Sequence, residues 1–419
     1  MGLCVRQVRR LLAAYRREGV AAIAHGNRGR RPVHALGEGV GKVVVALAQG
    51  PYAGLNHYHL TELLGERECL CLSRSTVRRI LVAAGLKSPR RRRPPTHRCR
   101  RARYPQEGML LQIDGSRHDW LEGRGAELTL VAAIDDATGT VPYALFRKQE
   151  DAQGYFLLLG EVIGRQGVPL ALYSDRHGIF QRSPKEGETL EEQLRGERQP
   201  TQFGRALREL GIQPIFALSP QAKGRIERLF GTLQDRLVSE LRLAGASTVE
   251  EANRVLEDFL PRYNVRFAIP ATQPGSAYRA RPEGVDLPSV LCFKYQRTVA
   301  GDNTVRFGGQ VLQVLPGVDR PSYAHARVEV QERLDGSLVV AYQGRVLATR
   351  EAPPHPVLLR ARKTTRGPSL SSLVAVSTEA VGPDQKAAHL APGNNGNGHK
   401  PSPTHPWRRC PVVTKSLNY

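Results

Sequence analysis

The chain has 419 residues, enough for two or three domains, and its 40% hydrophobic content is typical of a globular protein with buried cores. Lys and Arg number 61 against 39 Asp and Glu, so the formal net charge of +22 favours a polyanionic partner. No apolar run approaches the ~20 residues that span a bilayer, and no signal peptide opens the chain. These features argue against a membrane and for nucleic acid in the cytoplasm.

The cysteines are scattered, which is not the pattern of a disulfide framework and fits a reducing compartment. They are Cys4, Cys69, Cys71, Cys99, Cys292 and Cys410. His57, His59, Cys69 and Cys71 could form a zinc site, but only one residue separates the two cysteines, and structural sites usually place about two to four there. We expect small buried cysteines instead.

The first predicted element is an amphipathic helix within residues 1–35, ended by Gly19. Its apolar face contains Val5, Val8, Leu12 and Tyr15. The remaining surface is basic, with Arg6, Arg9 and Arg10 as candidates for DNA contact. We interpret this segment as a partial helix-turn-helix.

A second helix-turn-helix is predicted over residues 40–88, from "HLTELLGE" and "SRSTVRRILVAAGL". Ser73 or Ser75 can cap the second of these helices. Its inward face contains Val77, Ile80, Leu81 and Ala84, and its outward face contains Arg74, Arg78 and Arg79. Arginines there suit a recognition helix in the major groove, although any small helical bundle with a solvated basic face has the same pattern.

We predict a basic, proline-containing linker over residues 89–104, from the stretch "KSPRRRRPPTHRCRRAR". From Arg74 to Arg103 there are 12 Lys or Arg residues and no Asp or Glu. Such a run, which includes Arg90, Arg91, Arg92 and Arg93, contacts phosphates without reading bases. A nuclear-localisation signal is the other common interpretation, and it would apply only in a eukaryotic cell.

Alternating strands and helices follow over residues 105–275. "GMLLQIDGS" predicts a strand that ends at Asp114, and "PLALYSD" predicts a buried strand that ends at Asp175. Between them, "ELTLVAAIDDATGTVPYALF" predicts a hairpin with its turn at residues 135–139. The order β, β, β, α, β, α, β, α implies a mixed sheet flanked by helices. Trp120 is expected in the core, and Asp135 and Asp136 are expected as turn residues.

Three further regions differ in composition. Residues 181–200 are polar and rich in glutamate, which predicts a mobile surface loop. Residues 285–355 alternate in hydrophobicity around an Asp335-Gly336 turn and predict a small β-barrel. Residues 363–419 have little hydrophobic pattern and are expected to be disordered.

Three distant carboxylates stand out. Asp114 and Asp175 end predicted strands, and Glu227 lies at the edge of a helical apolar stripe made of Ile226, Leu229, Phe230, Leu233, Leu237 and Leu241. If the two strands are adjacent and parallel, both aspartates lie at one edge of the sheet. Converging carboxylates repel unless a cation neutralises them, and oxygen ligands suit Mg²⁺ or Mn²⁺. Alternatively, Glu227 simply pairs with Lys223.

Several blocks of sequence carry a family resemblance: "LLQIDGSRHDWLEGRG", "AAIDDATG", "LALYSDRHGIF", "TQFGRALRELGI" and "SPQAKGRIERLFGTLQDRLVSELRLAG". In this order they resemble the integrase-core transposases of bacterial insertion sequences, of the ISNCY type, which share an RNase H-like core with retroviral integrases. The resemblance extends from about Val5 to Ala271. It implies a multidomain protein with N-terminal helix-turn-helix modules, a central RNase H-like α/β sheet and a C-terminal β-barrel.

The resemblance also assigns roles. Asp114, Asp175 and Glu227 match the metal-binding DDE triad, which uses Mg²⁺ or Mn²⁺, with two ions expected. The implied reaction is nicking at the element's ends, followed by attack of the freed 3′-OH on target DNA. Lys223 and Arg225 are expected near the DNA backbone, and His177 either faces the site or caps its loop. The implied partners are double-stranded DNA and further copies of this chain, on the bacterial nucleoid.

Two alternatives remain open. The family usually has further helices before "VRQVRRLL", so the chain could be a DNA-binding regulator or a truncated, inactive copy. A simple RNase H-like nuclease is the other alternative, although its substrate would require no helix-turn-helix modules.

Overall fold

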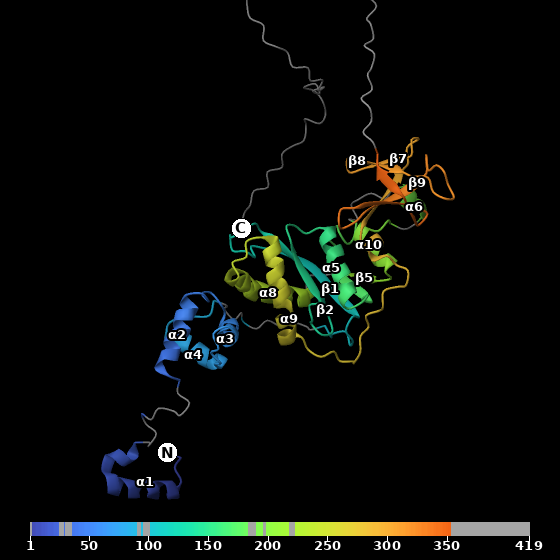
Figure 1. Ribbon diagram of the computed structural model, residues 1–419. Coiled ribbons are helices and arrows are strands. Elements are labelled where there is room, and N and C mark those ends of the chain that lie inside the picture. Colours follow the sequence, from blue (N-terminus) through green and yellow to red (C-terminus); the bar gives the residue numbers. More distant parts are fainter. Residues whose placement is uncertain are drawn as a thin grey trace, which may run out of the picture. The chain divides into compact units, whose positions relative to one another are not determined.

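The computed structural model describes residues 2–24, 29, 36–89, 94, 101–182, 190–195, 198–217 and 223–352 (Figure 1). The chain divides into two compact units, Met1–Pro353 and Pro354–Tyr419. The second unit, with the tail predicted for residues 363–419, lies outside the described residues, and so do Arg90, Arg91, Arg92 and Arg93 of the predicted linker.

The N-terminal part is helical, as predicted. Its elements are α1 (Val5–Glu18), the 3-10 helix η1 (Gly19–Ile23), α2 (Glu38–Gln49), α3 (His57–Glu66) and α4 (Arg74–Ala83). Gly19 ends α1 with φ of 65°, a conformation that glycine adopts without strain. The apolar face of α1 is exposed, and none of the described residues of this helix is buried.

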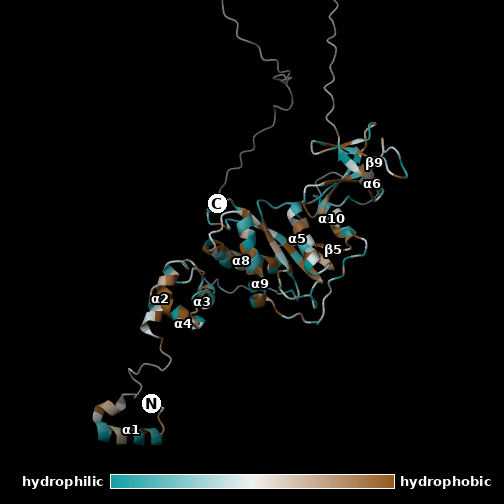
Figure 2. Ribbon diagram, in the orientation of Figure 1, coloured by the Kyte–Doolittle hydropathy of each residue, from teal (hydrophilic) through white to brown (hydrophobic). Residues whose placement is uncertain are grey.

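Helices α2, α3 and α4 share a small core. Asn56 caps α3, and Ser73 caps α4 by accepting a hydrogen bond from the Thr76 backbone N–H. Val77 and Leu81 of α4 are buried, whereas Ala84, which we expected to face inward, is exposed. The periodicity did not predict α2, whose apolar residues complete this core (Figure 2).

The first unit contains a five-stranded mixed sheet with strand order β3-β2-β1-β4-β5. Its strands are β1 (Leu110–His118), β2 (Leu128–Asp135), β3 (Tyr143–Arg147), β4 (Ala171–Ser174) and β5 (Gln213–Phe216). The pairs β1–β2 and β2–β3 are antiparallel, and the pairs β1–β4 and β4–β5 are parallel. The predicted mixed sheet flanked by helices is therefore confirmed.

Helices cover both faces of this sheet (Figure 1). They are α5 (Ala152–Arg165) and α7 (Gln202–Glu209) on one face, and α8 (Gly224–Leu243) and α9 (Val249–Phe267) on the other. A short helix, α6 (Leu190–Arg195), precedes α7 in the chain. Successive β2 residues alternate between two cores, since Leu130 and Ala132 pack with α8 and α9, while Val131 and Ala133 pack with α5 and α7. Trp120 is fully buried in the first core, as expected. The sequence patterns did not predict α9.

The described residues of the glutamate-rich segment 181–200 include a helix, which corrects the prediction of a loop for that part of the segment. It contains α6, and Glu192 of that helix is buried and accepts hydrogen bonds from Arg182 and from the Gln199 backbone N–H. Composition alone could not predict this, because the burial depends on tertiary partners.

The C-terminal part of the described chain is rich in strands. After α10 (Leu287–Val290) come β6 (Phe293–Thr298), β7 (Thr304–Phe307), β8 (Gln310–Val314), β9 (Arg327–Glu332), β10 (Leu338–Tyr342), β11 (Arg345–Leu347) and β12 (Thr349–Glu351). They form a four-stranded sheet, β11-β10-β9-β6, and a three-stranded sheet, β12-β8-β7. A closed barrel over residues 285–355 stays a prediction.

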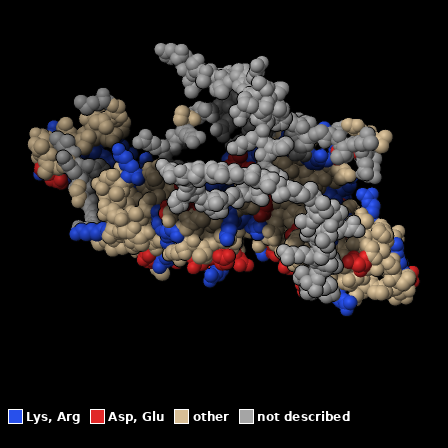
Figure 3. All heavy atoms as spheres, turned by 90° about the horizontal axis from the view of Figure 1, so that it is seen from above, with Lys and Arg blue, Asp and Glu red and all other residues tan. Residues whose placement is uncertain are grey.

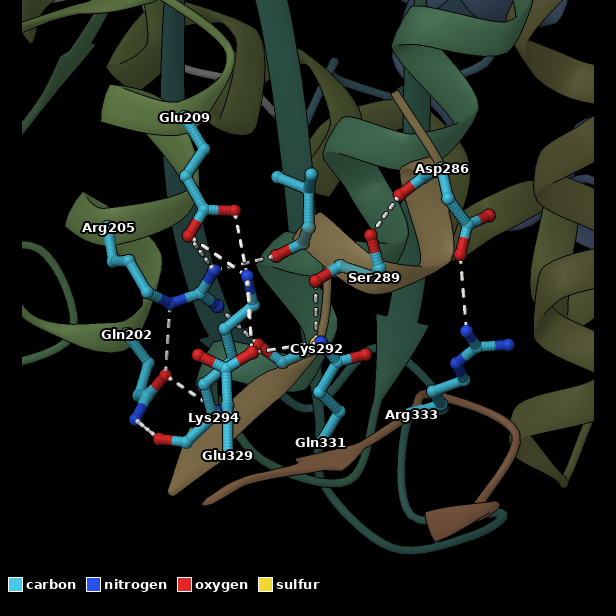
Figure 4. A network of polar contacts seen from close by, with 11 residues as sticks. Gln202, Arg205, Glu209, Asp286, Ser289, Cys292, Lys294, Glu329, Gln331 and Arg333 are labelled. Atoms are coloured by element: carbon cyan, nitrogen blue, oxygen red, sulfur yellow. Dashed lines mark hydrogen bonds and ion pairs between the residues drawn. The ribbon is translucent and has the colours of Figure 1, made fainter. Parts of the chain in front are cut away.

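A polar network joins these strands to α7 (Figure 4). Lys294 of β6 places its Nζ 3.0 Å from Oε2 of Glu209 and 3.7 Å from Oε1 of Glu329. Arg205 of α7 donates hydrogen bonds to the carbonyl oxygens of Val290 and Cys292 at 3.1 and 2.5 Å. Charge-assisted contacts thus attach α10 and β6 to α7.

The α2–α4 module contacts α8 and α9 through a second polar network. Glu240 of α8 accepts from His59 at 3.0 Å and from Arg67 at 2.6 Å. Arg236 of α8 pairs with Glu62 of α3. Because Glu240 is only 3% exposed, these contacts replace water as partners of a buried charge.

Candidate active site

Asp114 lies inside β1, and not at its end as we expected. The pairing of β1 with β4 stops at Gln112, opposite Tyr173, whereas the pairing with β2 continues to His118. The prediction was wrong because the antiparallel partner extends the strand beyond the point where the parallel partner leaves it. Asp114 therefore lies two residues past the last β1–β4 pair, level with Asp175, which lies two residues past Tyr173.

Asp175 directly follows β4, which is adjacent and parallel to β1 as the candidate site requires. Its Oδ1 accepts a hydrogen bond of 2.9 Å from the backbone N–H of His177. The imidazole Nδ1 of His177 accepts in turn from the Ile179 backbone N–H at 3.4 Å. Of the two roles considered for His177, this geometry matches the loop cap.

Lys223 joins the two aspartates. Its Nζ lies 3.0 Å from Oδ1 of Asp114 and 3.4 Å from Oδ2 of Asp175. The Lys223 side chain is 8% exposed, against 20% for Asp114 and 43% for Asp175. Lys223 therefore pairs with these carboxylates and not with Glu227, the partner that its spacing on the helix suggested.

Glu227 is exposed, although the helix that carries it packs as predicted. The apolar stripe of α8 is buried in the core between the sheet and α9: Ile226, Leu229, Phe230, Leu233, Leu237 and Leu241. Among the described residues, no three His, Cys, Asp or Glu side chains lie close enough to hold a metal ion. Asp114 and Asp175 thus converge without Glu227, whose role as a metal ligand stays a prediction.

Glu150 is a carboxylate near this site that the sequence patterns did not single out. It follows β3 by three residues, and its Oε1 accepts a hydrogen bond of 2.6 Å from Tyr155 of α5. Glycine at position 115 leaves room for it, because a Cβ there would lie 2.7 Å from the Glu150 carboxyl carbon. Burial, and then the negative charge of Glu150, raise the pKa of Tyr155 well above its usual value.

Burial also dominates the electrostatics of Asp114. Desolvation raises the pKa of Asp114 above its ordinary value, and the negative charges of Asp175 and Glu150 act in the same direction. The ammonium of Lys223 opposes them and lowers this pKa. The site therefore concentrates negative charge, and the ammonium is the principal group that compensates it at Asp114.

Arg225, a candidate for DNA contact, is bound to the protein itself. Its Nε lies 2.6 Å from Oδ1 of Asp136, and its side chain is 12% exposed. The same carboxylate accepts from Arg101, at the end of the predicted linker, and from the Tyr104 backbone N–H at 2.9 Å. Asp135 accepts from the backbone and hydroxyl of Thr138, as expected of a turn residue.

The other DNA-contact candidates lie on exposed helix faces. These are Arg6, Arg9 and Arg10 of α1, and Arg74, Arg78 and Arg79 of α4. Arg74 also stacks over the ring of Tyr58, 3.6 Å from its centroid. On the face shown in Figure 3, Lys and Arg side chains are interspersed with Asp and Glu. No contact in the structure tests these assignments.

The suggested zinc cluster does not form among the described residues. His59 binds Glu240 instead. Cys69 and Cys71 are free and exposed, which corrects the expectation that they are buried. Cys69, with φ of 55°, lies in the connection between α3 and α4. Within the described residues, no helix is both long and apolar enough to cross a membrane.

Comparison with solved structures finds distant likenesses. A simian T-cell lymphotropic virus intasome, in complex with the PP2A regulatory subunit B56 gamma, matches 74% of this chain and 99% of the other, with 15% identity and a TM-score of 0.31. The HTLV-2 integrase catalytic core domain in complex with magnesium matches 36% of this chain and 84% of the other, with 16% identity and a TM-score of 0.27.

Sequence comparison gives much stronger matches. "Putative transposase y4bF" of Sinorhizobium fredii is 34% identical over 417 residues, covering 98% of this chain and 88% of that protein. "Transposase for insertion sequence IS1202" of Streptococcus pneumoniae is 30% identical over 391 residues, covering 85% of this chain and 82% of that protein. No family model matches the chain. Both relatives are at least 30% identical to this chain, which covers more than four fifths of each of them, and the chain therefore belongs to the transposases of insertion sequences.

Proposed function

We propose that the chain is a DDE-type polynucleotidyl transferase, which nicks the 3′ ends of its own insertion element and joins them to target DNA. Asp114, Asp175 and Glu227 would hold Mg²⁺ or Mn²⁺, with two ions expected. The observation that carries the proposal is the meeting of Asp114 and Asp175, 61 residues apart in sequence, around one positively charged atom.

The donor set fits a divalent ion. Both aspartates offer an oxygen within 3.4 Å of Nζ of Lys223, so their carboxylates already face a common cation. Mg²⁺ binds oxygen at about 2.1 Å, so both carboxylates would have to approach the ion more closely than they approach the ammonium. Glu227 stands four residues after Lys223, about one helical turn along α8, and would approach from that side.

The protein's own groups would position DNA around this site. When bound, divalent ions would activate an attacking oxygen and stabilise the leaving oxygen of a phosphodiester. Lys223 would offer its ammonium to a backbone phosphate. Arg101, at the end of the basic linker, and Arg225, in the first turn of α8, both bind Asp136, so the linker would bring its positive charge to the start of that helix.

Cleavage of DNA that carries the element's ends tests the proposal. The wild-type chain should nick such DNA with Mg²⁺ or Mn²⁺, and Asp175→Asn should reduce the rate by at least about 10²-fold, because the ions lose a carboxylate ligand. Asp258→Asn, an exposed change on α9, is the matched control and should leave the rate unchanged. Equal rates for Asp175→Asn and the control would reject the assigned site.

A second candidate function is favoured by the position of Glu227, which stands outside the pair of aspartates. A chain that never brings Glu227 to the metal would bind the element's ends as a regulator without cutting them. End-specific binding, with no cleavage under any divalent metal, would support this candidate over the transferase.

A further inference from the structure

We propose that Lys223 is a built-in substitute for the metal: its ammonium holds Asp114 and Asp175 together in the metal-free protein and must leave before a divalent ion binds there. The inference rests on the proposed function, because it concerns the same two carboxylates. It adds a residue that regulates metal loading and that becomes available to DNA only after the exchange.

The position of Lys223 carries the first step. Its Nζ lies within 3.4 Å of a carboxylate oxygen of each aspartate, and its side chain is almost fully buried. Two carboxylates that share a site repel each other unless a positive charge lies between them. The ammonium supplies that charge, so the metal-free site is a compensated cluster and Lys223 is part of its structure.

Exclusion is the second step. A divalent ion that binds both aspartates would occupy the space now filled by the ammonium, and the two cations would repel strongly at contact distance in a half-buried site. Metal binding therefore requires Lys223 to leave. The net affinity for the ion is the intrinsic affinity of the carboxylates reduced by the cost of breaking the two ion pairs.

The third step concerns where the ammonium goes. Lys223 is the N-cap residue of α8, and a flexible four-carbon stem carries its charge, so rotation of the stem can release it while the helix stays packed by Ile226 and Leu229. Glu227 follows on the same side of the helix four residues later. Exit of Lys223 would thus vacate the position toward which Glu227 must move, and would present the ammonium to a phosphate.

The test compares Mn²⁺ binding by the full-length wild type with binding by Lys223→Gln, using calorimetry and the electron paramagnetic resonance of free Mn²⁺. Without its competitor, the variant should bind Mn²⁺ at least about ten-fold more tightly. In EDTA its melting temperature should be lower than that of the wild type, and saturating Mn²⁺ should remove the difference. Unchanged or weaker Mn²⁺ binding by the variant would overturn the inference.

Controls separate charge from structure. Lys223→Arg keeps the positive charge and should therefore keep wild-type Mn²⁺ affinity. A gain in affinity for Lys223→Arg as large as that expected for Lys223→Gln would contradict competition by charge. Lys42→Gln, an exposed change on α2, removes the same charge elsewhere and should leave Mn²⁺ affinity unchanged. A gain of affinity in Lys42→Gln as large as in Lys223→Gln would contradict local competition, because net charge would then explain both.

A further variant distinguishes the inference from the proposed function. Asp114→Asn combined with Lys223→Gln should lose the gain in Mn²⁺ affinity, since one of the two carboxylates is gone. If wild-type Mn²⁺ binding depends on Asp114 but not on the charge of residue 223, the metal site stands and the inference fails. If neither the wild type nor Lys223→Gln binds Mn²⁺ through Asp114, the proposed function fails as well.

Discussion

Arg225 Nε lies 2.6 Å from Oδ1 of Asp136, so the first turn of α8 is tied to the turn between β2 and β3. Asp136 is fully buried and also accepts a hydrogen bond of 2.9 Å from the Gln112 side chain amide. The oxygen of that amide accepts from the Ile226 backbone N–H at 3.4 Å. The Asp136 carboxylate thus joins β1, the β2–β3 turn and the start of α8. The start of α8 carries Lys223 and Glu227, so their positions depend on this contact.

Asp136→Ala should destabilise the protein by about 3–5 kcal/mol, because it leaves the nearly buried guanidinium of Arg225 without a counter-charge. Denaturant unfolding followed by circular dichroism would measure the loss. The exposed Asp258→Asn change should cost less than about 0.5 kcal/mol. A similarly small cost for Asp136→Ala would show that the carboxylate does not anchor the helix.

DNA binding should depend on the basic face of α4. Replacing Arg74, Arg78 and Arg79 together by Gln should weaken binding to the element's ends and reduce the slope of log K against log salt by about 0.9 for each phosphate that the arginines neutralise in the wild type. Fluorescence anisotropy over a range of salt concentrations would give both quantities. Arg254→Gln, exposed on α9, is the matched control. If the triple variant kept the wild-type slope, the DNA would not contact these arginines of α4.

The contact between the α2–α4 module and α8 should make stability depend on pH. Burial by itself raises the pKa of Glu240, but the hydrogen bond from His59 and the positive charges of Arg262 and Arg67 outweigh it, so this pKa is lowered. A carboxyl group with a lowered folded-state pKa stabilises the protein above its unfolded pKa, about 4.3 for glutamate, and this contribution is lost as the pH falls through the folded-state pKa.

The variant Glu240→Gln isolates that contribution. At pH 7 it should be less stable than the wild type by about 1–3 kcal/mol, because Gln keeps some hydrogen bonds but carries no charge. The difference should shrink progressively below about pH 5, as Glu240 of the wild type is protonated. Denaturant unfolding across this range measures it, and a difference that stays constant down to about pH 3 would assign the effect to packing.

Periodicity and strand patterns predicted what depends on local sequence. The apolar stripe of α8 has a spacing that only a helix can bury on one side, and "PLALYSD" has the length and composition of a buried strand. Their arrangement in a mixed sheet followed from the element order. The meeting of Asp114 and Asp175 could therefore be anticipated, although the strand containing Asp114 runs further than expected.

Tertiary contacts determined what the patterns missed. Glu150 carries no motif, and only the folding of the segment after β3 beside Gly115 of β1 brings it toward Asp114. Lys223 could be paired by spacing only with Glu227, since its contacts with Asp114 and Asp175 depend on how α8 packs. Helix α2 has an almost uncharged sequence, which periodicity cannot distinguish from a buried strand.

Metal-dependent nicking by Asp114→Asn tests the central claim most directly. We predict that the wild type, incubated with Mn²⁺ and a duplex carrying one end of its element, releases a free 3′-OH at that end. Asp114→Asn should fold and bind the same duplex but nick it at least about 10²-fold more slowly. Nicking at the wild-type rate by this variant, still dependent on Mn²⁺, would contradict the account.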